Sequence, residues 1–284
     1  MRMSASLLCL IPFAAVCTGQ PTAREVIERI KKNVNCEWRA ETIDTFKAGN
    51  PDTKVKGIAV TLMATFDVLQ RAAASGKNLI ITHEPTFYEH QDQAKAMEGD
   101  AILAAKREFI DKHGLVVWRF HDHWHMHKPD GIDQGMIAKL GWEKFEKDTA
   151  GPVPYFELPP TTVGKLAADL KAKFHARSIR VVGDPAMKVT KAAFSAGAPS
   201  TIGQMKALSG TPVEVLVAGE TREWETVEYV RDSARAGKPK ALILLGHVIS
   251  EEGGMENCAS WLKGFVKDAP VEFIPAGEPF WSPE

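Results

Sequence analysis

Residues 78–85 read Asn78-Leu-Ile-Ile-Thr-His-Glu-Pro85, and the centre of this stretch is the continuous, mostly apolar run Leu79–Thr82. A run without polar alternation is typical of a strand buried on both faces of a parallel sheet. The preceding residues 64–75 carry apolar side chains at helical spacing and stop at Gly76, so a helix is expected before the strand. The stretch therefore predicts an α/β unit that presents His83 and Glu84 at the carboxyl end of its strand.

The same arrangement occurs twice more along the chain. The run Leu115–Phe120 leads into a cluster of histidines, and Ala241–Leu245 leads into Gly246-His247. Because strands alternate with helices, we expect an α/β fold of two similar lobes with mixed, partly parallel sheets. The lobes are predicted over residues 21–148 and 149–284, with a metal site between them at strand carboxyl ends. Helices are expected over residues 23–34, 64–75, 100–113, 134–139, 162–174, 223–236 and 255–266, and further strands over residues 55–61, 178–182, 191–194 and 212–217.

Residues 1–20 have the pattern of a signal peptide. A basic start is followed by the apolar run Leu7–Val16 and then by small residues, and this run is too short to span a bilayer. We therefore expect an exported protein, periplasmic or secreted, with a buried first helix as the alternative reading and lipidation at Cys17 as a further option. No other segment is long enough for a membrane helix.

Charge and cysteine content limit the possible functions. The 35 Lys and Arg residues nearly balance the 36 Asp and Glu residues, without a basic stripe, so no nucleic-acid partner is expected. Two cysteines, Cys36 and Cys258, lie beyond the signal peptide. Neither belongs to a Cys-x-x-Cys pair, which favours buried structural cysteines over metal ligands, and the sequence leaves a disulfide between them open.

The segment His121-Asp-His-Trp-His-Met-His127 carries four histidines at alternate positions. If the extended conformation of the preceding strand continues, all four side chains point to one side, which suits a metal ion better than it suits packing. At most two or three of them can bind one ion, and Pro129-Asp-Gly131 is expected to stop the strand. The alternative is a histidine-rich surface loop.

Two other segments pair a histidine with a carboxylate. His83-Glu84 is a weak signal alone, whereas Gly246-His247-Val-Ile-Ser-Glu251 places the two residue types four apart where a strand ends and a helix begins. Ser250 is expected to cap the final helix, and the helix dipole then accounts for Glu252 better than for Glu251. The isolated histidines are interpreted as structural; they are His90, His113 and His175.

These segments together resemble the family of GTP cyclohydrolase 1 type 2 homologues, which are described as dinuclear-metal hexameric proteins. Residues 55–65 are similar to the family's first strand and turn, and residues 78–85 to its first metal motif. Residues 120–141 resemble its second motif and the following helix, and residues 246–251 its third motif. The resemblance covers nearly all of the chain after the signal peptide, and it implies a hexameric ring around metal centres.

The chain departs from that family at three positions. His83-Glu84 stands where the family has two adjacent histidines, His125 stands where it has an aspartate, and Met63 replaces the aspartate of its Leu-Asp-Ala-Thr turn. A histidine and a carboxylate have thus exchanged places, and Glu84 must take over bridging if two ions are bound. The ligand positions that the resemblance implies are His83, Glu84, His125, His247 and Glu251, with His121 or His123 as a spare ligand.

Mixed nitrogen and oxygen ligands suit zinc or iron, with manganese or nickel as further candidates, at one or two ions per chain. We expect a metal-dependent hydrolase with an unidentified carbon–nitrogen or ester substrate and with Glu252 or Asp122 as proton shuttle. GTP itself is not expected, because the chain has no Gly-rich phosphate loop and an exported protein rarely meets GTP. The alternative function is a non-catalytic metal-binding hexamer, a scaffold or sensor. A third candidate is the metallo-β-lactamase type, whose signature shares His121-x-His123 but continues with an Asp-His pair that this chain lacks.

Overall fold

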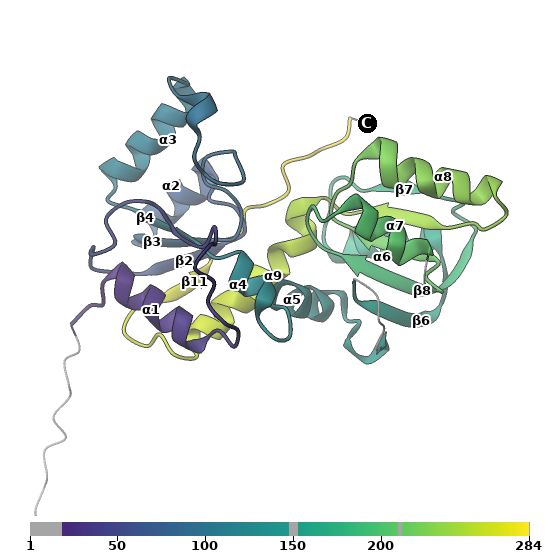
Figure 1. Ribbon diagram of the computed structural model, residues 1–284, viewed down its shortest axis with the longest axis horizontal. Coiled ribbons are helices and arrows are strands. Elements are labelled where there is room, and N and C mark those ends of the chain that lie inside the picture. The colour runs from purple at the N-terminus through teal and green to yellow at the C-terminus, as the bar shows by residue number, and fades with distance from the viewer. Residues whose placement is uncertain (1–18, 148–152, 210–211, 284) are drawn as a thin grey trace, which may run out of the picture.

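The run Leu79–Thr82 is the central strand of a five-stranded sheet in the computed structural model, which describes residues 19–147, 153–209 and 212–283 (Figure 1). In order across this first sheet, the strands are β1 (Phe46–Ala48), β4 (Val116–Arg119), β3 (Leu79–Thr82), β2 (Ile58–Thr61) and β11 (Val271–Phe273). All are parallel except β1, which pairs antiparallel with β4. The carboxyl ends of β3 and β4 therefore meet at one edge of the sheet.

A second sheet has six strands. In order they are β5 (Glu146–Lys147), β6 (Tyr155–Thr162), β8 (Lys188–Ser195), β9 (Val215–Ala218), β10 (Ala241–Leu244) and β7 (Arg180–Val182). Strands β8, β9 and β10 are parallel, and the other pairings are antiparallel. The prediction of an α/β fold with two mixed, partly parallel sheets is confirmed. Below, the first lobe and the second lobe are these two sheets with the helices packed on them.

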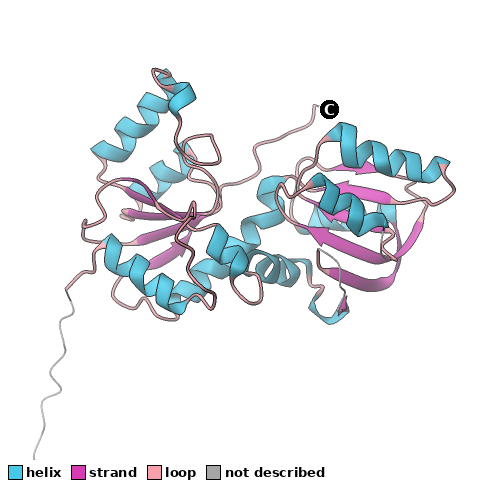
Figure 2. Cartoon of the chain, viewed as in Figure 1, coloured by secondary structure: helices cyan, strands magenta, loops and turns pink. Residues whose placement is uncertain are grey.

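Helices cover both faces of each sheet (Figure 2). Apolar side chains of α2 and α3 pack on one face of the first sheet, and those of α7 and α8 pack on one face of the second sheet. The other faces share one continuous core with α1, α5, α6 and α9. The helices are α1 (Ala23–Asn33), α2 (Phe66–Ala74), α3 (Ala101–Lys112), α4 (Asp122–Met126), α5 (Gly131–Leu140), α6 (Val163–Lys173), α7 (Thr201–Ser209), α8 (Glu228–Arg235) and α9 (His247–Lys263), with the short helices η1 (Lys95–Met97), η2 (Glu143–Phe145) and η3 (Glu223–Val227).

The ends of the chain carry three further expectations. The signal peptide lies outside the described residues, apart from Gly19 and Gln20. Among the residues that the structure describes, no helix is long and apolar enough to cross a membrane. Cys36 and Cys258 are free thiols, so the disulfide that the sequence left open does not join them.

The final helix begins earlier than expected. It starts at His247, eight residues before the predicted start, so Ser250 is not its N-cap. The Ser250 hydroxyl instead donates to the His247 carbonyl oxygen from inside the helix and accepts from the Gly197 amide. Gly246, with a φ of 89°, makes the turn into the helix. The adjacent glycines Gly253 and Gly254 have low helix propensity, which is why this part of the helix was not predicted.

The chain returns to the first sheet after α9. β11 pairs in parallel with β2, with Glu272 opposite Ala59. The segment 149–284, expected to form the second lobe, therefore supplies the edge strand of the first sheet. Helix α9 lies between the two lobes and contacts α5, β2 and β11 (Figure 1).

Helices α5 and α9 cross at a contact between glycines. A Cβ added to Gly135 would lie 2.4 Å from the carbonyl oxygen of Gly253, and one added to Gly254 would lie 2.5 Å from the Cα of Ile132. No side chain larger than that of glycine fits between these backbones. The two helices can approach this closely only because these positions are glycines, which lower the intrinsic stability of each helix. The crossing fixes the position of α5 relative to α9. It therefore also fixes the histidines of the α4 segment, which precedes α5, relative to His247 at the start of α9.

We expect Gly254→Ala to lower the free energy of unfolding by about 1–3 kcal/mol, because the new methyl group meets backbone atoms that cannot rotate away. The matched control is Gly203→Ala in α7, where the nearest atom would be 3.7 Å from the new Cβ. That variant should be unchanged or more stable by up to about 1 kcal/mol. Chemical denaturation followed by circular dichroism measures both, and equal effects would contradict a tight crossing.

Candidate metal centre

His83 lies at the carboxyl end of β3 and is completely buried. Its Nδ1 donates to the carbonyl oxygen of Phe120 at 3.1 Å, and its backbone carbonyl accepts from the Nε of Arg119 at 2.9 Å. Its Nε2 is buried and has no hydrogen-bond partner among the described residues. Burial, together with the neighbouring His121 and His125, holds the pKa of His83 well below its usual value, so the ring is neutral.

The segment that follows β4 is not extended, which corrects the prediction for the four alternate histidines. Residues Asp122–Met126 form the short helix α4, so His121 and His125, four apart, lie on one side of it. His123 points elsewhere: its ring stacks on Trp38 with centroids 3.6 Å apart, and its Nε2 accepts from the Arg39 amide at 2.9 Å. His127 bonds through Nδ1 to the Pro129 carbonyl oxygen. Two of the four histidines therefore face His83.

Asp44 turns this segment into a helix. The fully buried Asp44 carboxylate accepts from the backbone amides of His121, Asp122 and His123 at 2.6–3.0 Å, which are the free N–H groups of the first turn of α4. Its Oδ2 also accepts from the Nδ1 of His123 at 2.7 Å. A carboxylate from a distant loop thus acts as the helix cap, and a local sequence pattern does not reveal it.

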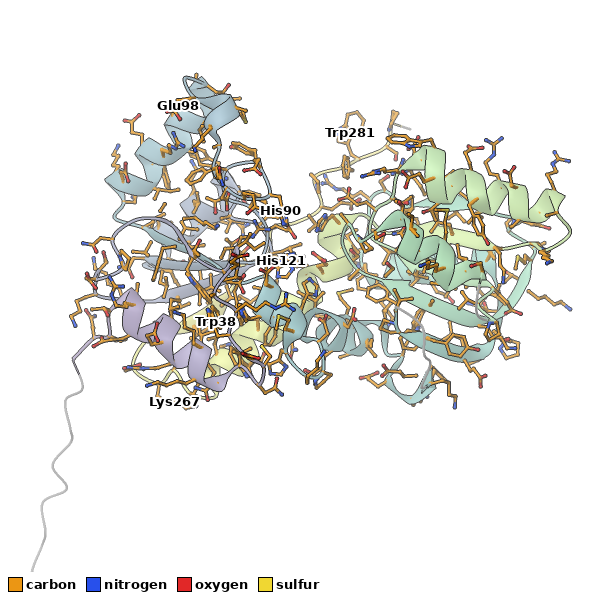
Figure 3. The ribbon with its side chains drawn as sticks, in the orientation of Figure 1. Trp38, His90, Glu98, His121, Lys267 and Trp281 are labelled. Atoms are coloured by element: carbon orange, nitrogen blue, oxygen red, sulfur yellow. The ribbon has the colours of Figure 1, made fainter. Side chains whose placement is uncertain are left out.

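His83, His121 and His125 form a compact group. Their ring centroids are 4.5 to 5.0 Å apart, and one nitrogen of each lies within 4.8 Å of the others. Burial lowers the pKa of His121, and the charge of His125 adds to this effect. Burial also lowers the pKa of His125, but the hydrogen bond from its Nδ1 to Asp130 at 2.9 Å outweighs it and raises the pKa to about 9. His121 and His90 lie on the side of the first lobe that faces the second (Figure 3).

A second group shares His83 and adds two carboxylates, Glu84 and Glu251. The buried Glu84 lies between positive charges, with Oε2 3.5 Å from Arg119 and Oε1 3.4 Å from the Nε2 of His247. Burial raises the pKa of Glu84, but the hydrogen bond from His247 and the charges nearby outweigh it and keep this pKa below its usual value. Glu84 is therefore an anion.

His247 begins α9 and contacts carboxylates on both sides. Its Nδ1 bonds to Glu220 at 2.8 Å, and its Nε2 bonds to Glu251 at 2.9 Å. Burial lowers the pKa of His247, but its carboxylate partners raise it to about 12. Glu251 packs on Gly197, where an added Cβ would lie 2.0 Å from Oε1. His247 therefore links Glu220 to the buried Glu251 across the start of α9.

The four histidines of the centre are His83, His121, His125 and His247. The Nδ1 of each one is hydrogen-bonded to an oxygen atom of the chain. A carbonyl or carboxylate oxygen only accepts, so Nδ1 carries a proton and Nε2 faces the centre. Oxygen partners of this kind orient histidines around metal ions in proteins. The unpartnered, buried Nε2 of His83 and the carboxylates beside it fit a divalent cation. The oxygen partners are Phe120 for His83, Asp122 for His121, Asp130 for His125 and Glu220 for His247.

The structure brings together all six residues expected as metal ligands. Of the two expected proton shuttles, Asp122 contacts a histidine of the centre and Glu252 does not. The Asp122 carboxylate bonds to His121 Nδ1 and accepts from Thr42 and from the Ile43 amide. Glu252 accepts from the amides of Ala276 and Gly277 and lines a separate cavity beside Lys139 and Lys173. Sequence reasoning missed the supporting residues Asp44, Arg119 and Glu220, and it read Asp130 only as the end of a strand.

Comparisons with known proteins agree with the resemblance seen in the sequence. A family model described as Duf34/NIF3 (NGG1p interacting factor 3) matches residues 21–278. A relative from Clostridium acetobutylicum named GTP cyclohydrolase 1 type 2 homolog is 26% identical over 193 residues, which cover 65% of this chain and 68% of the relative. A relative of the same name from Clostridium perfringens is 24% identical over 239 residues, covering 81% and 86%.

A solved structure supports the same fold. The Bacillus cereus protein described as related to NIF3 aligns with a TM-score of 0.73 at 14% identity, and the alignment covers 93% of this chain and 99% of that one. At this identity the likeness concerns the fold alone. The two mixed sheets and their covering helices are thus an arrangement that other proteins share.

Loss of the Asp44 carboxylate should loosen the histidine segment. We expect Asp44→Asn to lower the free energy of unfolding by about 3 kcal/mol, because buried amides lose a charged acceptor. The exposed Asp111→Asn is the matched control and should change stability by less than about 0.5 kcal/mol. Denaturation measures stability, and NMR of the imidazole protons should show altered His121 signals in Asp44→Asn alone. Unaltered His121 signals would contradict the capping role.

Proposed function

The chain belongs to the Duf34/NIF3 family, and from this premise we propose that it is a metal-dependent hydrolase with a dinuclear His/carboxylate centre. The proposed ligands are the six residues gathered at the lobe boundary: His83, Glu84, His121, His125, His247 and Glu251. The names of the two clostridial relatives refer to a hydrolytic ring-opening enzyme, which agrees in reaction class.

The observation that carries the proposal is the unpartnered Nε2 of His83. A buried imidazole nitrogen without a hydrogen bond costs free energy unless another group meets its lone pair. Two groups of possible ligands converge on His83, one with two further histidines and one with Glu84 and Glu251. A cation beside Nε2 would satisfy the lone pair and neutralise the carboxylates.

Glu84 is the proposed bridging carboxylate. Its Oε1 lies 3.8 Å from the Nε2 of His121 and 3.4 Å from the Nε2 of His247, so it reaches histidines of both lobes. Arg119 is buried and holds Oε2 from the other side. In the family that this chain resembles, a histidine stands at the position of Glu84 and an aspartate at the position of His125. The contacts of Glu84 support the proposal that it has taken over the role of that aspartate. Three nitrogen ligands or more with two carboxylates suit zinc or iron, and manganese or nickel as further candidates.

Bound metal would supply a Lewis acid and lower the pKa of a coordinated water toward about 7. The chain itself orients the ligands through the oxygen partners of each Nδ1, and it buries His83 completely. Asp122 stays our proposed proton shuttle because its carboxylate contacts His121. The contacts of Glu252 with backbone amides do not support that role for it.

A cavity beside the centre favours catalysis over a purely structural metal site. His247 and Glu220 form part of the wall of a cavity of about 540 Å³, a size that holds a small molecule. The alternative of a non-catalytic scaffold or sensor does not require such a space. We propose a carbon–nitrogen or ester substrate, and we keep export and hexameric assembly as predictions that fractionation and light scattering test.

Metal content tests the centre directly. We expect purified protein to hold about one to two ions per chain, and His83→Ala to lose most of them, because His83 belongs to both groups. His113→Ala, which removes a histidine at the end of α3, is the control and should keep the wild-type content. Elemental analysis and thermal unfolding measure content and folding together. Wild-type protein without metal, after growth and reconstitution with zinc or iron, would refute the proposal.

The exchanged ligands allow a sharper test. We expect Glu84→His and His125→Asp each to lower metal content and hydrolytic rate, because each changes the ratio of imidazoles to carboxylates. The double variant restores that ratio and the family's order, so its metal content should be at least threefold that of the weaker single variant, which corresponds to a favourable coupling of at least about 0.7 kcal/mol. Hydrolysis of a panel of amides and esters provides the activity. Additive losses in the double variant would argue against bridging by Glu84.

A further inference from the structure

The cavity beside His247 lies where parallel sheets bind ligands. It opens at the carboxyl ends of β9 and β10, and its walls come from the residues that directly follow these strands. Glu220 and His247 belong to both the cavity and the metal centre. A molecule in this cavity therefore has one end at the proposed ligands.

The C-terminal tail forms part of the cavity wall and is fastened at two points. The Glu278 carboxylate accepts from the amides of Arg177 and Ser178 at 2.6 and 2.9 Å. Further on, the Ser282 hydroxyl bonds to that of Ser178 at 3.3 Å. Between these points Phe280 and Trp281 line the cavity. The tail is thus held against the second lobe by specific bonds and is part of a built wall.

The tail presents aromatic rings that have no covering in the described chain. Trp281 is 70% exposed and Phe280 is 64% exposed, although both line a cavity. Large apolar side chains at this exposure bury area only when something binds against them. The family model ends at residue 278, so these two rings lie beyond the part of the chain that the family match covers.

Met63 adds an apolar surface to the cavity lining that is specific to this chain. Met63, from the loop after β2, lines the cavity at the position where the resembling family has an aspartate. Its thioether is a flexible apolar surface that makes favourable contacts with aromatic rings. The carboxylates of Glu220 and Glu278 and the single Arg180, which pairs with Glu223 at 2.5 Å, leave no surplus positive charge for a polyphosphate.

We propose that this cavity is the substrate site and that it selects a small molecule with an aromatic ring, held between Met63 and the tail residues Phe280 and Trp281. The hydrolysable polar group of this molecule lies at the His247 end. The reaction at that polar group rests on the proposed hydrolase function, whereas the binding of the ring does not depend on it.

The test compares two amides that differ only in a ring. Indole-3-acetamide and acetamide are titrated into the full chain, with and without added zinc, and binding is followed by saturation-transfer NMR and calorimetry. Indole-3-acetamide should bind and acetamide should not bind measurably. Trp281→Ala should weaken indole-3-acetamide binding about tenfold, the size expected for loss of an aromatic pair. Met63→Ala should weaken it about threefold.

Trp224→Ala is the matched control, because Trp224 is 74% exposed and does not line the cavity. Its affinity for indole-3-acetamide should equal that of the wild type. Equal binding by wild type and Trp281→Ala, or equal binding of both amides, overturns the inference. A change of oligomeric state in Trp281→Ala with unchanged affinity overturns it too, since the tail would then contact a second copy. Ring binding by protein that retains no metal and cleaves no amide refutes the hydrolase while leaving the ring site intact.

Discussion

The close crossing of α5 and α9 at glycines is the constraint on which the rest of this protein depends. Backbone meets backbone at Gly135 and Gly253, so the two helices can adopt only a narrow range of distances. Helix α5 follows the segment with His121 and His125, and α9 begins with His247 and carries Glu251 one turn later. A change in this crossing would move the ligands of one lobe away from those of the other.

The centre concentrates charge around the fully buried His83. Such a site is costly to bury, and the chain offsets the cost by pairing nearly every polar atom with a fixed partner. Asp44 satisfies the first turn of α4, Arg119 holds both the His83 carbonyl and Glu84, and His247 stands between Glu220 and Glu251. The Nε2 of His83 is the buried atom at the centre that has no hydrogen-bond partner among the described residues. Buried polar atoms in native proteins are nearly always hydrogen-bonded, so this nitrogen calls for a partner such as a bound ion.

Several elements could be predicted from the sequence because they are locally determined. The buried strands β3, β4 and β10 are recognisable in the sequence as continuous apolar runs, and histidines follow their carboxyl ends. Other elements depend on partners. Strand β6 contains Pro159-Pro160 and has an irregular register with β8, so it has no clean strand pattern, and it was not predicted. The start of α9 was missed because its glycines are favourable only against α5.

The sequence by itself determined the ligand types, their order along the chain and their positions after buried strands, because side-chain chemistry and strand periodicity are local properties. It also indicated the α/β class and the family resemblance. Only the tertiary structure decided that the histidine segment is a helix, since the cap that makes it one is the distant Asp44. It also decided which histidines converge: His123 turns to Trp38 while His121 and His125 turn to His83. Convergence is a property of the distances between segments, and those distances are set by packing that no local pattern encodes.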